Sequence, residues 1–199
     1  LAAAYLLGVR RLARRGDAWA PGRTAAWLLG CLLLLVMTSS GIGRYSPAVF
    51  SVHMVSHMAM NMLVPVLLAM GGPVTLALRA LRPAGRDDPP GVREWIARAT
   101  VSPVLARLTH PLPVLALFVG SNFVFYLTGL FELSLSYHWG HQLMNLHFLL
   151  VGYLFFWPII GVDPAPSRLP HVGRLAVLLA AMPFHAFFGV TLMSTSTVL

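Results

Sequence analysis

Apolar residues follow one another in long stretches along this chain instead of alternating with polar ones. About 20 apolar residues cross the hydrocarbon core of a bilayer as an α-helix, because each residue adds ~1.5 Å. The pattern predicts the cut end of one helix at 1–13, followed by five spans at about 24–41, 48–71, 111–131, 138–160 and 174–197. The predicted fold is therefore all-α, a polytopic transmembrane helix bundle that forms a single domain over 1–199. Because the chain begins inside a helix, we expect it to be a fragment of a longer membrane protein.

Residues 73–109 have a different pattern, in which arginines alternate with apolar residues. This pattern predicts one or two short amphipathic helices that lie at the membrane surface. A solvated loop is the alternative.

Composition and charge agree with a membrane protein, since 57% of the residues are hydrophobic and 10% are charged. The formal net charge of +8 could indicate a nucleic-acid partner, but thirteen of the fourteen basic residues, all arginines, fall in alternate loops: 10–23, 72–110 and the last loop. By the positive-inside rule these loops are cytoplasmic, and the protein is predicted to span the bacterial plasma membrane several times. The charge is thus a topology signal, and no nucleic acid is expected.

Histidine and methionine gather in the predicted outer half of three spans. The stretch SVHMVSHMAMNML contains His53 and His57, four residues apart and so on one helix face, with Met54 and Met58 beside them. Further members lie on the two last spans: His138, His141, Met144, His147 and His185. One intramembrane histidine is often a helix–helix hydrogen bonder, and methionine is often core filler. Six histidines on one side of the membrane are better explained by a functional site.

The donor types favour copper. Thioether is a soft ligand and imidazole a borderline one, a set that suits Cu(I) better than Mg²⁺ or Ca²⁺. Zinc sites normally include Cys or a carboxylate, and Cys31 is the single cysteine. The spans hold almost no carboxylates, which argues against a proton pump, and no nucleophile–base–carboxylate set indicates a hydrolase. We therefore expect no enzyme, and a metal site formed by His53, His57, His138, His141, His147, His185, Met54, Met58 and Met144.

Two other classes stay open. A haem b electron carrier needs two histidines at matching depth on different helices, and His147 with His185, or His57 with His141, could supply them. A metal-free scaffold for oxidase subunits would leave the histidines unexplained.

Several segments resemble a known family: YSPAVFSVHMVSHMAMNMLVPVLLAMGGP, THPLP, HWGHQLMNLHFLLVGYLFFWPIIGVDP and MPFHAFFGVTLM. Over about 24–199 the chain resembles the multi-span CtaG family of cytochrome c oxidase assembly factors, in its actinobacterial form, which is often fused to a CopD-like copper-resistance half. The resemblance implies a membrane-embedded factor that delivers copper to cytochrome c oxidase subunits, with His53, His57, His141, His147 and His185 in the family's histidine positions. Asn145 stands where many relatives have a further histidine.

Overall fold

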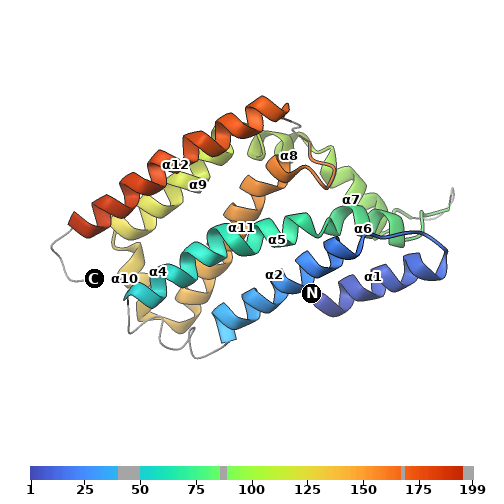
Figure 1. Ribbon diagram of the computed structural model, residues 1–199, viewed down its shortest axis with the longest axis horizontal. Helices are drawn as coiled ribbons and strands as arrows, with labels where there is room; N and C mark the ends of the chain where they lie inside the picture. The colour runs from blue at the N-terminus through green and yellow to red at the C-terminus, as the bar shows by residue number, and fades with distance from the viewer. Residues whose placement is uncertain (40–49, 86–88, 167–168, 195–199) are drawn as a thin grey trace.

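The computed structural model describes residues 1–39, 50–85, 89–166 and 169–194 (Figure 1). Within these ranges the chain forms helices and no strand, which confirms the all-α prediction. The first half contains α1 (Ala2–Arg14), α2 (Pro21–Ser39), α4 (Phe50–Met58), the π-helix η1 (Ala59–Leu63), α5 (Val64–Met70) and α6 (Pro73–Ala80). The second half contains α7 (Val92–Thr100), α8 (Pro103–Leu108), α9 (Pro111–Leu127), α10 (Leu130–Ser136), α11 (His138–Ile160) and α12 (His171–Ser194).

Four helical stretches are long and apolar enough to cross a membrane: Pro21–Ser39, Val52–Ala80, Trp139–Ile160 and His171–Thr191. They match four of the predicted spans, although the predicted ends within 40–49 and beyond 194 lie outside the described residues. The fifth predicted span, 111–131, is shorter than expected. Its helix α9 ends at Leu127 because Thr128 is extended (φ −120°, ψ 165°), and α10 then begins as a separate helix.

Large apolar side chains are exposed along α2 and α12, as expected for helices that face lipid. Leu32 and Leu35 on α2 are 54% and 59% exposed, and Phe187 on α12 is 63% exposed. Exposed apolar surface of this kind is unfavourable in water and favourable in the hydrocarbon core of a bilayer.

The elements α4, η1 and α5 form one continuous helix, which we call the central helix, and its geometry changes at η1. Pro65 has no N–H, so the carbonyl of Asn61 loses the donor that an α-helix would give it. Residues 59–63 adopt the wider π-helical turn instead. Opposite this turn, α11 has Gly152, and a Cβ added there would lie against the Asn61 carbonyl oxygen. The absence of a side chain at 152 therefore allows η1 and α11 to approach closely.

The buried apolar residues form three groups. The first lies among α1, α2, α5 and α6 and includes Trp27 and Leu68, and the second joins α9, α11 and α12 around Phe118 and Phe155. We call the third the aromatic cluster; it consists of Tyr126, Phe131, Met144, Phe148 and Phe188. This cluster lies beside the histidines of α4.

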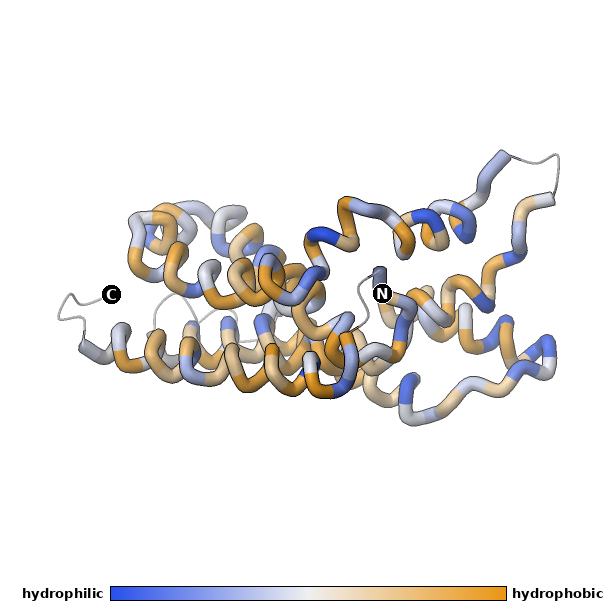
Figure 2. Tube along the Cα trace, turned by 90° about the horizontal axis from the view of Figure 1, so that it is seen from above, coloured by the Kyte–Doolittle hydropathy of each residue, from blue (hydrophilic) through white to orange (hydrophobic). Residues whose placement is uncertain are grey.

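The segment predicted to hold one or two amphipathic surface helices contains three short ones, α6, α7 and α8. Helix α6 begins at Gly72, whose positive φ (+63°) suits glycine. The buried carboxylate of Asp163 accepts hydrogen bonds from the Val74 and Thr75 amides, at 3.0 and 2.7 Å, and so caps α6. Figure 2 shows that hydrophilic segments gather at the end of the molecule farthest from the C-terminus.

Candidate metal centre

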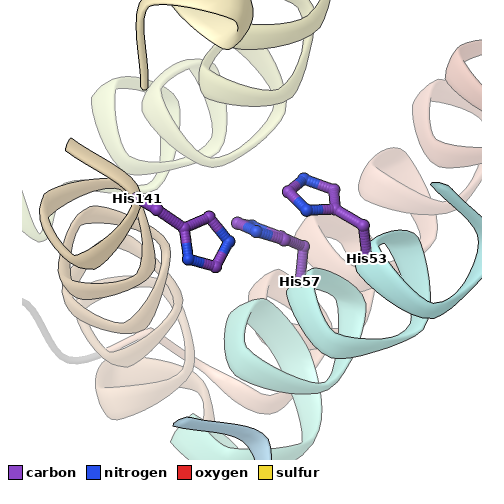
Figure 3. A group of neighbouring side chains, drawn as sticks. All are labelled: His53, His57 and His141. Carbon is purple, nitrogen blue, oxygen red and sulfur yellow. The ribbon is translucent and has the colours of Figure 1, made fainter. Parts of the chain in front are cut away.

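Three of the predicted site residues, His53, His57 and His141, meet between two helices. The first two lie on α4 and the third on α11, and their rings face one another (Figure 3). One nitrogen from each ring can be chosen so that all three lie within 4.8 Å of one another. The His53 and His57 ring centroids are 4.1 Å apart, and that of His141 is 5.5 and 5.6 Å from them. This group could hold one metal ion.

Local helix geometry explains why the three rings meet. His53 and His57 are four residues apart, so they lie one above the other on the same face of α4. That helix continues through η1 into α5, and both of these pack against α11. The close approach at Gly152 holds α11 near the central helix, and His141 lies three turns earlier on α11.

The surroundings of His53 and His57 are aromatic and apolar. His53 and His57 are each 1% exposed. Phe131 lies with its ring edge-on to His53, and Phe148 lies edge-on to His57, both at 5.1 Å between centroids. Tyr126 is perpendicular to both histidines, at 6.1 and 6.3 Å. His53 and His57 therefore lie in a low-dielectric enclosure, and the partly buried His141 lies at its edge.

Among the described residues, neither ring nitrogen of His57 has a hydrogen-bond partner, although both are buried. A buried polar atom without a partner costs roughly 1–3 kcal/mol, so such atoms usually have a functional reason. The Tyr126 hydroxyl is also buried without a hydrogen-bond partner among the described residues. A metal ion among the three rings would satisfy a nitrogen of His57.

The predicted methionine ligands lie in or against the aromatic cluster. Met144 is 1% exposed, and its sulfur accepts a hydrogen bond of 3.3 Å from the Ser134 hydroxyl. Met54 and Met58 are partly buried and pack against the same cluster. Thioethers therefore line the hydrophobic wall next to the histidines.

The other predicted histidines are placed elsewhere. Nε2 of His147 shares a 2.9 Å hydrogen bond with the Ser121 hydroxyl, and Nδ1–H of His185 donates to the Ala181 carbonyl at 3.1 Å. Neither belongs to the group of three. The side chain of His138 lies outside the described part of the structure. Whether these three residues bind metal stays a prediction.

Sequence reasoning missed the residues that enclose the histidines, Tyr126, Phe131 and Phe148. Their types gave no signal, because aromatic residues are common throughout the spans. It also missed Asn61, which is fully buried and whose two side-chain polar atoms find no partner in the described part of the chain. Its position four residues after His57 was a usable signal, since it continues the histidine face.

The fold and the site define the class of this protein, a membrane helix bundle with a group of three histidines between two helices. Comparison with known proteins identifies the family: residues 3–199 match the model of the cytochrome c oxidase caa3 assembly factor family (Caa3_CtaG). The chain belongs to this family, which confirms the resemblance drawn from its motifs and extends it nearly to residue 1.

Mycobacterial relatives share about half of its residues. An uncharacterized protein of Mycobacterium leprae (strain TN) is 53% identical over 193 residues, which cover 97% of this chain and 29% of the relative. Uncharacterized proteins of Mycobacterium bovis and Mycobacterium tuberculosis are each 52% identical over 197 residues, 99% of this chain and 30% of the relative. The chain thus spans about 30% of the length of the curated relatives it matches. No solved structure gives a significant match.

Proposed function

We propose that this protein is a membrane assembly factor for cytochrome c oxidase that binds Cu(I) at His53, His57 and His141 and passes it to an oxidase subunit. The observation that carries the proposal is the group of three imidazoles, two of them buried, whose ligand atoms lie within 4.8 Å of one another. Family membership supports the assembly role.

Charge favours Cu(I) over a divalent ion at this group. The desolvation cost of an ion rises with the square of its charge, so a doubly charged ion loses about four times as much on entering an apolar enclosure. Among the described residues the group contains neutral ligands alone, which leave the charge of the ion uncompensated. Imidazole binds copper well, and the neighbouring Met54, Met58 and Met144 provide soft donors for the transfer step.

Transfer requires only ligand exchange between soft donors, so the protein needs no catalytic group. The positive-inside rule places the three histidines toward the outer side of the plasma membrane, since α4 starts on the side opposite the arginine-rich loops. The proposed client is therefore an oxidase subunit that receives copper near that surface.

The test measures Cu(I) binding to the purified full-length protein by elemental analysis and by competition with a chromophoric Cu(I) chelator. We expect about one copper per chain, at least a tenfold loss of affinity in His57→Ala, and no loss in His110→Ala, whose histidine is exposed at the start of α9. Unchanged binding in His57→Ala would refute the three-histidine site.

Further variants decide the role of the remaining predicted ligands. His147→Ala and His185→Ala should retain copper if the group of three is sufficient. Met54→Leu with Met58→Leu should weaken copper retention while the helices stay folded. A Soret band with stoichiometric iron would instead identify the haem b carrier, and binding of neither metal would leave a scaffold.

A further inference from the structure

A second candidate site lies far from the histidines, between α1 and α6. A cleft of about 550 Å³ opens there, within the size range of small-molecule sites. Its walls are mostly apolar, with Leu7 and Ala4 from α1 and Leu76 and Ala77 from α6. The two helices touch at its floor, where a Cβ added to Gly8 would lie 3.2 Å from the Leu76 side chain.

An arginine pocket adjoins this cleft. It measures about 420 Å³ and is lined by four arginines: Arg11, Arg14, Arg15 and Arg82. Two of them, Arg11 and Arg14, also line the apolar cleft, so the two spaces are neighbours. An apolar cleft and a strongly cationic pocket therefore lie side by side.

Among the described residues, little negative charge compensates the arginines of the pocket. The nearby carboxylate of Asp17 is 3.7 Å from Arg79, which does not line the pocket. Arg15 donates a 3.3 Å hydrogen bond to the Arg79 carbonyl, which brings no opposite charge. Within the described residues, Arg11, Arg14 and Arg82 have no ion-pair partner. Four guanidinium groups at one place repel one another unless an anion lies between them.

The neighbouring aromatic residues are those of a membrane interface. Trp19 lies under the guanidinium of Arg23, 5.0 Å from the ring centroid, and donates a hydrogen bond to the Tyr5 hydroxyl. Tyr5 itself lines the apolar cleft. Trp and Tyr concentrate at the level of lipid headgroups, so the arginine pocket lies where phosphate groups are found.

We propose that this composite site binds an anionic phospholipid, with an acyl chain in the cleft between α1 and α6 and the phosphate headgroup among Arg11, Arg14, Arg15 and Arg82. Guanidinium groups hold phosphate through two parallel hydrogen bonds, which makes four of them a specific headgroup site. The apolar cleft distinguishes a lipid from a free phosphate ion. The proposal concerns a second site and does not depend on metal binding.

Native mass spectrometry of the detergent-purified full-length protein tests the proposal, with dioleoyl phosphatidylglycerol and the zwitterionic dioleoyl phosphatidylcholine as probes. We expect preferential binding of phosphatidylglycerol and a loss of about tenfold in its affinity in Arg11→Gln/Arg14→Gln, because two headgroup contacts are removed. The control Arg98→Gln/Arg107→Gln changes the net charge equally at arginines outside the site and should bind as the wild type does.

A second pair of variants tests the apolar cleft. Ala4 is exposed and lines the cleft, so Ala4→Trp should fill it and reduce lipid binding without disturbing the core. Ala3→Trp, at an exposed neighbour outside the lining, should leave binding unchanged. Equal binding of the two lipids, or full binding in Arg11→Gln/Arg14→Gln, would overturn the proposal. Displacement of phosphatidylglycerol by an equal concentration of inorganic phosphate would also overturn it, since it would reveal an ion site only.

Discussion

Because η1 and α11 approach closely at Gly152, even the smallest side chain added there should destabilise the fold. In Gly152→Ala the new methyl group would meet the Asn61 carbonyl oxygen and lie 2.8 Å from Cγ of Pro65. Both obstacles belong to rigid parts of the chain, a backbone carbonyl and a proline ring, so neither can turn aside. The helices must separate to accept the methyl group.

The magnitude follows from two opposing effects. Alanine is favoured over glycine inside a helix by ~1 kcal/mol, and overpacking costs ~1–3 kcal/mol. Because the contact is with backbone, we take the upper end of that range and expect a net loss of ~2 kcal/mol. For a chain of this size that lowers the melting temperature by about 4–8 °C. Since His141 is on the same helix, the proposed Cu(I) site should lose affinity as well.

Gly120 on α9 provides the control, because a Cβ added there meets nothing within 4 Å. Gly120→Ala should therefore melt at or slightly above the wild-type temperature. The assay is thermal unfolding of both variants in the same detergent, followed by Cu(I) competition. If Gly152→Ala melts as high as Gly120→Ala, the packing argument is refuted.

Two further predictions concern the loops at the arginine-rich end. Asp163→Ala removes both hydrogen bonds to the start of α6 and should lower the free energy of unfolding by about 2 kcal/mol in a denaturation assay. The control Asp17→Ala breaks a half-exposed ion pair and should lower it by less than ~1 kcal/mol in the same assay. Equal effects of the two variants would show that Asp163 is not a structural cap. The Ala84 amide, together with that of Gly91, donates to Glu94 and holds the pKa of its carboxyl below the ordinary value of 4.5. Because the folded-state pKa is the lower one, this stabilisation is present above pH 4.5 and is lost as the pH falls through the lowered pKa. The melting temperature of Glu94→Gln should therefore depend less on pH than that of the wild type between about pH 3 and 6, and parallel curves would contradict the assignment.

The spans were predictable because length and hydropathy alone determine which segments cross a bilayer. The end of α9 at Leu127 was not, since an apolar run does not reveal where Thr128 turns the backbone to an extended conformation. The π-helical turn also escaped prediction. It depends on Pro65 within the helix and on Gly152 across from it, two positions 87 residues apart in the sequence.

The candidate metal site was predicted in part. The four-residue spacing of His53 and His57 was enough to place them on one face, and their outer-half position suggested the partner span. Spacing does not determine how each helix rotates about its own axis. His147 is six residues after His141 and so points in a different direction, where Ser121 provides its hydrogen bond. His185 is bonded to its own helix through the Ala181 carbonyl.

The π-helical turn makes the geometry of the three-histidine group depend on how many residues the continuous helix α4–η1–α5 contains, and not only on which residues they are. One extra residue in a turn shifts the helical phase by about 100°, so η1 sets the orientation of α4 relative to α5. Removing one residue from 59–63 would restore an ordinary helix and turn His53 and His57 away from His141 while α5 kept its packing. In this protein a single-codon deletion in a segment that contributes none of the three histidines would therefore act as a loss of the proposed metal site.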